Sequence, residues 1–425
     1  MTDLPPGWKW TTLGDIADVV GGVTKDSKRE SRPDLVEVPY LRVANVQRGR
    51  LDLSNVSFIR VPKKKAAQLE LQPGDILLNE GGDRDKLGRG WIWQGQIPGC
   101  IHQNHVFRAR IRNGLHHPKL LAWYANEVAH KWFEINGKQS VNLASISLST
   151  IRTFPVPVPP AAERFRIVDI LENHLSRLDV ARSSLNRSRA RLTRLRQAML
   201  ASILNLAEST QGCEVRSIEE IAAVGTGATP LKAQRDYYNG GTIPWITSAD
   251  LMQGLIQKPT QFVTLRALAE TSVKLFAPGT LLVAMYGEGK TRGTVGELAI
   301  AATTNQACAA VQLHDPNPSH RAWVRLALEA SYWRMRRLAA GGVQPNLNLS
   351  LVRQIRVPLP EADTRDSLLR TRDAHEQARR RLESELRLIE KRESSLRTAL
   401  LGAAFLGQLT GQARDMDLVE EMAGV

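Results

Sequence analysis

The sequence predicts an α+β fold in which two related domains lie in tandem, each followed by a long helix, and the two helices form an antiparallel coiled coil. Three observations predict this: an internal repeat, a proline-rich segment that ends each copy, and a seven-residue apolar pattern after each copy. The expected bounds are 1–160 and 208–360 for the domains, 161–207 and 361–409 for the helices, and 410–425 for a C-terminal tail.

The repeat keeps a nearly constant register. Leu13–Val19 recurs 205 residues later as Ile218–Val224, and the offset has shortened to 201 where the proline-rich segments begin near Pro157 and Pro358. A period this long indicates two copies of one domain and excludes a short-period solenoid.

Each copy mixes strand and helix patterns. Short apolar runs that end near Gly or Pro, Asp75–Asn79 and Thr280–Ala284, predict strands separated by loops. Two amphipathic stretches, Lys119–Phe133 and His320–Leu338, predict helices. Each copy therefore reads as an α+β domain of ordinary size.

The segments that follow the copies have apolar residues at every seventh position, which is typical of a coiled-coil seam. Proline stops the first domain, because it cannot continue a ladder or a helix interior. Each helix would run for ~40 residues, or ~60 Å at 1.5 Å per residue. The alternative is two independent helices, each lying on its own domain. The predicted seam residues are Leu171, Leu178, Leu185 and Leu192 on the first helix and Leu382, Ile389 and Leu396 on the second.

Composition favours a soluble, cytoplasmic protein with a polyanionic partner. There are 57 Lys and Arg against 43 Asp and Glu, a net charge of +14. Such a surplus favours nucleic acid, because neutralised phosphates release counterions, although a basic surface also serves solubility. Three cysteines far apart argue against a disulfide framework, and no apolar run is long enough to span a bilayer.

No catalytic site is expected. Met285–Thr291 ends like a phosphate-binding loop, but the first glycine of that motif is replaced by Ala284. Cys100, His102 and His105 have metal-binding side chains, yet their spacing matches no standard zinc pattern. We therefore expect no metal and no catalytic residue in this chain.

The candidate DNA-binding residues lie on matched loops of the two copies. Basic, glycine-rich loops can follow a phosphate backbone closely, and Asn or Gln can bond bidentately to adenine. The alternative for the amides is that they satisfy backbone groups at strand edges. The candidates are Lys25, Lys28, Arg29, Arg84, Lys86, Arg89, Gln103 and Asn104 in the first copy, and Lys232, Arg235, Lys290, Arg292, Asn305 and Gln306 in the second.

The ordered landmarks on this duplicated frame resemble a known family. They are Leu4–Trp8, Val156–Glu163, Gly225–Pro230, Gly342–Leu347 and Leu400–Leu409. Together they resemble the specificity (S) subunit of Type I restriction–modification systems over nearly the whole chain. Two departures concern Gly21–Lys25, where Thr-Pro is usual, and the helix starts, where Glu-Gln is common.

The resemblance implies a non-catalytic subunit whose two target-recognition domains each read one half of a bipartite, double-stranded DNA target. The helices would space the domains and dock two modification subunits, which carry S-adenosylmethionine and methylate adenine. Restriction subunits that use ATP and magnesium would join them, and this chain itself would bind no cofactor. The alternative is a non-catalytic coiled-coil scaffold or an RNA-binding adaptor, which needs the basic loops but no sequence discrimination. A recognition half cut from a fused restriction–methylation enzyme is a further rival.

Overall fold

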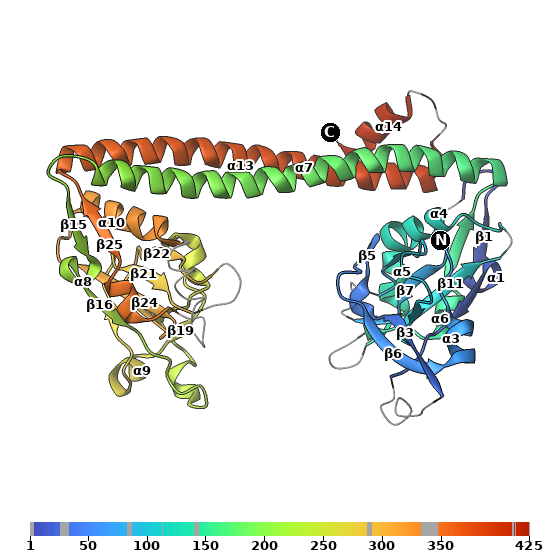
Figure 1. Ribbon diagram of the computed structural model, residues 1–425, viewed down its shortest axis with the longest axis horizontal. Coiled ribbons are helices and arrows are strands. Elements are labelled where there is room, and N and C mark those ends of the chain that lie inside the picture. The colour runs from blue at the N-terminus through green and yellow to red at the C-terminus, as the bar shows by residue number, and fades with distance from the viewer. Residues whose placement is uncertain are drawn as a thin grey trace. The chain divides into compact units, whose positions relative to one another are not determined.

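The computed structural model describes residues 4–25, 34–82, 87–112, 114–139, 144–286, 291–332, 347–409, 412 and 414–424. The chain divides into two compact units, each of which holds one copy of the repeat. Unit 1 comprises Met1–Leu185 and Arg387–Val425, and unit 2 comprises Asn186–Leu386. The predicted fold class, two tandem α+β domains each followed by a long helix, is confirmed (Figure 1).

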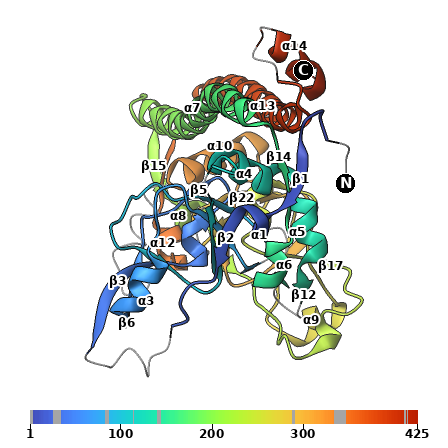
Figure 2. The ribbon, with the colours of Figure 1, turned by 90° about the vertical axis from the view of Figure 1, so that its right-hand side faces the viewer.

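Unit 1 contains several small sheets. The four-stranded sheet has the order β2-β11-β7-β9, and the three-stranded sheet has the order β10-β3-β6. Its strands are β1 (Lys9–Thr12), β2 (Ala17–Val20), β3 (Leu35–Leu41), β4 (Val46–Gln47), β5 (Arg50–Leu51), β6 (Ser57–Pro62), β7 (Ile76–Asn79), β8 (Gly81–Gly82), β9 (Gly90–Ile92), β10 (Ile101–His102), β11 (Val106–Ile111), β12 (Lys138–Gln139), β13 (Ala144–Ser145) and β14 (Pro155–Val158). Its shorter helices are α1 (Leu13–Ile16), α3 (Lys63–Leu69), α4 (Pro118–Trp123), α5 (His130–Asn136), α6 (Leu148–Arg152) and α14 (Arg414–Ala423). The long antiparallel pair β3 and β6 carries α3 beside it (Figure 2).

Unit 2 repeats this plan with local differences. Its five-stranded sheet has the order β16-β24-β21-β22-β18, and a four-stranded sheet has the order β19-β17-β23-β20. Its strands are β15 (Glu214–Ser217), β16 (Ala222–Thr226), β17 (Ile243–Ile246), β18 (Leu255–Ile256), β19 (Phe262–Val263), β20 (Leu275–Phe276), β21 (Leu281–Ala284), β22 (Val295–Leu298), β23 (Ala302–Thr304), β24 (Cys308–Leu313) and β25 (Arg356–Leu359). Its shorter helices are α8 (Ile218–Ile221), α9 (Leu265–Glu270), α10 (Pro318–Ala330) and α12 (Leu349–Arg353).

The proline-rich segments form edge strands rather than mere stops. β14 pairs antiparallel with β1, and β25 pairs antiparallel with β15, each pair standing as a two-stranded sheet. An edge strand tolerates proline because its outward side needs no N–H donor. From these strands the chain enters the long helices α7 (Ala161–Glu208) and α13 (Ala362–Phe405).

The amphipathic stretch predicted as one helix over Lys119–Phe133 is interrupted. α4 passes into a π-helical turn, Tyr124–Val128, before α5 begins at His130. The corresponding helix of unit 2, α10, is a regular α-helix. It starts with Pro318 in its first turn, and the Asn317 side chain caps it by accepting from the Ser319 and His320 backbone N–H groups.

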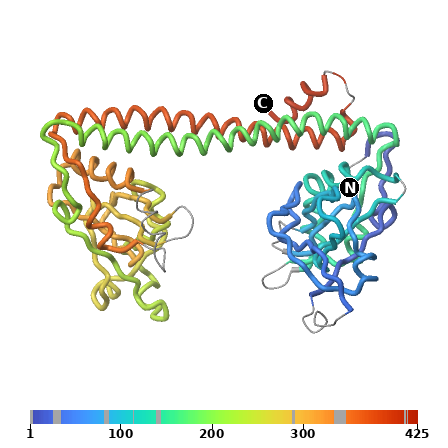
Figure 3. The backbone as a smooth tube through the Cα atoms, viewed as in Figure 1, coloured from blue at the N-terminus to red at the C-terminus, as the bar shows by residue number. Residues whose placement is uncertain are grey.

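The core of unit 1 joins the sheet domain to the long helices. Its buried apolar cluster combines Trp8, Phe133 and Phe154 of the domain with Leu171 of α7 and Leu400 of α13. Both chain ends belong to this unit, and α14 lies on the far side of the long helices from the sheets (Figures 1 and 3). In unit 2 the cluster joins residues of α10 with Leu200 and Ile203 of α7 and Leu368 of α13. Each domain is therefore packed against the helix segments of its own unit.

Within each unit, α7 and α13 contact each other in antiparallel order. In unit 1, Asp179 forms an ion pair with Arg397, and the next contact along α7, Arg182 to Glu393, lies earlier on α13. In unit 2, Arg196 Nε lies 3.4 Å from Glu376 Oε2. Antiparallel contact of the helices thus holds in both units, while coiled-coil packing stays a prediction.

The predicted seam residues differ in exposure between the two helices. Leu171 and Leu185 are buried, and Leu178, Leu192 and Leu396 are partly buried. In contrast, Leu382 and Ile389 are 47% and 50% exposed. The less exposed positions one residue further along α13 are glutamates, Glu383 and Glu390. At these two positions the less exposed side of α13 therefore carries glutamate, and the seam itself stays a prediction.

None of the helices in the described ranges combines the length and apolarity needed to cross a membrane.

Candidate nucleic-acid interface

Three segments meet at one end of the unit 1 sheets. The segment after β2 crosses the β10–β11 turn, where the Val23 N–H donates to the His102 carbonyl (2.9 Å) and the Asn104 N–H donates to the Val23 carbonyl (3.0 Å). The chain after β7 joins them, because the Glu80 N–H donates to the His105 carbonyl (2.9 Å). We call this arrangement the three-loop cluster of unit 1: residues 21–25, 80 and 103–105.

Unit 2 builds the same cluster from different residues. The Ala228 N–H donates to the Thr304 carbonyl (2.9 Å), and the Met285 N–H donates to the Ala307 carbonyl (2.7 Å). We call residues 226–230, 285 and 305–307 the three-loop cluster of unit 2. The backbone frame is thus repeated while the side chains differ.

A glycine at the same place in each copy lets the first segment approach the turn. A Cβ on Gly22 would lie 1.9 Å from the His102 carbonyl oxygen, and one on Gly227 would lie 1.7 Å from the Thr304 carbonyl oxygen. No other residue fits without displacing the backbone. These glycines, 205 residues apart, hold each cluster together.

The candidate amides follow β10 and β23 directly, at equivalent positions. The Gln103 N–H donates to the Leu41 carbonyl (2.9 Å), and the Asn305 N–H donates to the Ile246 carbonyl (3.1 Å). The Asn305 side-chain oxygen accepts from the Ala307 N–H (3.1 Å), so this residue serves the turn, as the backbone alternative predicts.

The neighbouring amides have side-chain partners within the clusters. Gln306 is exposed and forms a hydrogen bond with the Thr229 hydroxyl. In unit 1, Asn104 Nδ2 lies 3.3 Å from His105 Nε2, and His105 Nδ1 lies 2.7 Å from Glu80 Oε2. Gln306, the exposed amide of unit 2, is therefore better placed to face a ligand than Asn305.

The described candidate cations lie on or next to these clusters. Lys25 is exposed in the first segment of unit 1, and Lys232 and Arg235 are exposed after the equivalent segment of unit 2. Arg89 and Arg292 are half-buried, each just before the strand that pairs with β7 or β21. The remaining candidates, Lys28, Arg29, Arg84, Lys86 and Lys290, lie outside the described residues.

One buried residue that positions a strand beside the candidate interface was not predicted from the sequence. The buried Asn126 in the π-helical turn donates to the Gly90 carbonyl (2.9 Å) and accepts from the Gly90 N–H (3.0 Å). It thereby fixes the start of β9, the strand that follows the basic loop. A polar amide within an otherwise apolar helical run was the only signal for it.

In unit 2, ion pairs from α10 hold the equivalent strand, β22, in place. Arg321 and Arg325 of α10 place their guanidinium nitrogens 2.9 and 3.2 Å from the carboxylate oxygens of Glu297 on β22. Both units thus tie the strand after the basic loop to the helix beside the long helices.

Two buried cysteines and a buried histidine are held in their uncharged forms. Burial raises the pKa of the Cys100 and Cys308 thiols to about 12, so both stay protonated near neutral pH. Burial lowers the pKa of His102 to about 4, and its Nδ1 donates to the Val106 carbonyl (2.6 Å). Among the described residues no group of three or more His, Cys, Asp or Glu is arranged to hold a metal ion.

The sequence matches the model of one protein family twice. The Type I restriction modification DNA specificity domain matches residues 5–186 and 210–374. The chain belongs to this family. The two matches correspond to the two copies of the repeat, each extended into the helix that follows it.

Named relatives agree with this assignment. The chain is 21% identical over 441 residues to the type I restriction enzyme StySPI specificity subunit of Salmonella potsdam, covering 98% of this chain and 92% of that protein. It is 27% identical over 161 residues to the MjaIX specificity subunit of Methanocaldococcus jannaschii. The matches to that protein and to the MjaX specificity subunit of the same organism span only 36% and 40% of the relatives' lengths.

A solved structure shows the same fold. It is a chain described in connection with complex assembly and conformational transition of the type I R-M system. The TM-score is 0.72 at 18% identity, and the match covers 96% of this chain and all of the other. The fold is therefore shared at low sequence identity.

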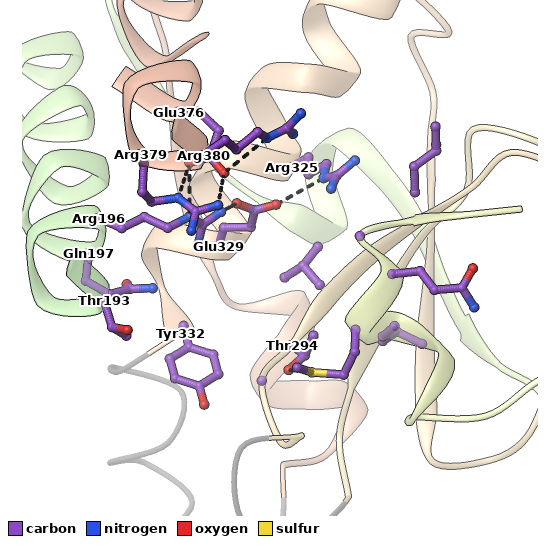
Figure 4. Close-up of a pocket in the computed structure, with 17 residues that line it drawn as sticks. Thr193, Arg196, Gln197, Thr294, Arg325, Glu329, Tyr332, Glu376, Arg379 and Arg380 are labelled. Atoms are coloured by element: carbon purple, nitrogen blue, oxygen red, sulfur yellow. Dashed lines mark hydrogen bonds and ion pairs between the residues drawn. The ribbon is translucent and has the colours of Figure 1, made fainter. Parts of the chain in front are cut away.

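Unit 2 also holds an open cleft of about 770 Å³, bordered by α7, α13, α10 and the turn Asp250–Gln253 (Figure 4). Arg196 projects into it and pairs with both Glu329 of α10 and Glu376 of α13. Burial raises the pKa of Glu376, but hydrogen bonds from Arg379 and the nearby charge of Arg196 outweigh it and lower the pKa overall. The cleft wall is thus a chain of paired charges that ties the second specificity domain to both long helices.

Proposed function

We propose that this chain is the DNA sequence-specificity subunit of a Type I restriction–modification complex, and that each domain reads one half of a bipartite target. The observation that carries the proposal is the three-loop cluster, built twice on one backbone frame with different side chains. Exposed Lys25 supports phosphate contact in unit 1, and Lys232 and Arg235 support it in unit 2. Asn104 and Gln306 are the side chains from which we expect base contacts.

We propose further that the chain catalyses no step itself and positions partners that do. Two modification subunits carrying S-adenosylmethionine would methylate adenine, and restriction subunits using ATP and magnesium would cleave. The outward side of α13 supports docking, because Leu382 and Ile389 are half-exposed and Leu388 is 67% exposed. Large apolar side chains exposed in this way on one helix are typical of an interaction surface.

The test is to co-express the chain with modification subunits, purify the complex through this chain, and map methylated bases in the host DNA. We expect co-purification and methylated adenines within one two-part motif. Leu388→Glu should abolish co-purification while the purified chain still binds DNA. The proposal would be contradicted by methylation that follows no two-part motif, or by methylation that does not depend on the presence of this chain. Preferential binding to single-stranded RNA would favour the adaptor alternative.

A further inference from the structure

The centres of α7 and α13 carry opposite charges at the same spacing. Arg182, Arg189 and Arg196 recur at every seventh residue of α7, and Glu376, Glu383 and Glu390 recur at every seventh residue of α13. We call these six residues the Arg/Glu ladder. A seven-residue period keeps each set on one side of its helix.

The contacts within the units place the two sets opposite each other. In unit 2, Arg196 Nε lies 3.4 Å from Glu376 Oε2. In an antiparallel pair, a step of seven back along α7 meets a step of seven forward along α13. Extended along both helices, this register would set Arg189 opposite Glu383 and Arg182 opposite Glu390; Glu383 also pairs with Arg379 of its own helix.

In unit 1 the contacts between the helices are displaced from this register by about one helical turn. Arg182 Nε lies 3.9 Å from Glu393 Oε2, one helical turn beyond Glu390. Glu393 is only 4% exposed, and Arg397 Nε lies 3.3 Å from its other carboxylate oxygen. The α13 side of this contact is therefore dehydrated at Glu393, where an unpaired or like charge is costly, whereas the Arg182 side chain is 54% exposed.

Like-with-like pairing would oppose equal charges. In an antiparallel pair of two α7 helices centred on Arg189, Arg182 would face Arg196. Two α13 helices centred on Glu383 would set Glu376 against Glu390. Only α7 with α13 matches each arginine with a glutamate, and charges in and beside a helix seam are known to set partner choice and orientation.

We propose that the Arg/Glu ladder determines which helices pair. It favours pairing of α7 with a helix that carries an acidic seven-residue series over pairing with a second α7. It likewise favours pairing of α13 with a helix that carries a basic series over pairing with a second α13. The ladder thereby favours pairing of α7 with α13 within one chain over pairing of α7 with α7, or of α13 with α13, between two copies of the chain. This inference concerns the helices alone and stands or falls without DNA.

The test reverses two layers of the ladder and leaves Arg196, which also holds Glu329, in place. The full-length variants are R182E/R189E, E383R/E390R and the four-fold variant that combines them. The matched control is R191E/R194E, which reverses two exposed arginines of the same helix. We expect each two-fold ladder variant to unfold several degrees below wild type, the control to stay near wild type, and the four-fold variant to regain most of the loss.

A second measurement reads partner choice directly. The two two-fold ladder variants are co-expressed with different affinity tags. Each then finds a complementary helix only on the other chain, so one tag should capture the other in a chain-swapped dimer. Two wild-type copies should show no such capture. Absence of cross-chain capture, or a four-fold variant no more stable than its two-fold parents, overturns the proposal.

Discussion

Replacing Gly227 by alanine should disable the second reader and spare the first. The added Cβ would lie 1.7 Å from the Thr304 carbonyl oxygen, whereas real Cβ atoms essentially never approach a neighbour closer than 3.0 Å. The segment must therefore move by at least 1.3 Å (3.0 − 1.7). Forced overpacking of this kind costs about 1–3 kcal/mol.

The displacement acts on the cluster that carries the candidate base contacts. It breaks the bond from the Ala228 N–H to the Thr304 carbonyl and moves Thr229 away from Gln306. Affinity for the half-site read by unit 2 should fall about tenfold or more, since each 1.4 kcal/mol is a factor of ten. Gel shifts on duplexes with one or the other half-site scrambled measure this.

The matched control is Gly225→Ala, because a Cβ at Gly225 meets no atom within 4 Å. It should bind like wild type. If Gly227→Ala and Gly225→Ala bound both half-sites equally well, the three-loop cluster would not be the reading surface.

Three further predictions follow from other parts of the molecule. His102 is disfavoured as a cation in the folded state, so below its ordinary pKa of 6.5 unit 1 loses stability until its folded pKa of about 4 is reached. Replacing His102 by Thr, the residue at the equivalent position 304, should shrink the stability difference between pH 7 and pH 5 by about 2 kcal/mol, and an unchanged difference in thermal melts would refute this. Replacing Lys290 and Arg292 by alanine should reduce the slope of log binding constant against log salt concentration by about one unit per lost phosphate contact. An unchanged slope would exclude both residues from the DNA interface. Deleting Leu185–Arg191 with the facing heptad Arg381–Arg387 should shorten the preferred spacer by about three base pairs, ~10 Å at 1.5 Å per residue, or abolish binding. Full affinity for the original spacer in a folded variant would exclude the helices as a ruler.

The two-domain fold could be predicted from the sequence because the internal repeat and the seven-residue period are visible over many residues and do not depend on any single contact. The leucines at every seventh position of α7 are buried or partly buried, and Gly22 and Gly227 occupy matching positions within the repeat. Leu382 and Ile389 are about half exposed, and the less exposed positions beside them hold Glu383 and Glu390, which an apolar pattern does not detect.

The side-chain contacts that hold the candidate interface and the helices in place could not be predicted from the sequence. Asn126 and the charge chain of Arg196, Glu329 and Glu376 join elements that are far apart along the chain. Such contacts depend on tertiary packing and leave no periodic trace. The turn role of Asn305 depends on its backbone geometry in the same way.

Site selection from random duplexes tests the central claim most directly, with the full chain and its modification subunits present. The account predicts one motif of two fixed parts separated by a constant length of unspecified sequence. Replacing Cys213–Pro360 by the matching domain of a relative should change one part and leave the other part intact. A single continuous motif, or two parts that both change on this exchange, would contradict the account.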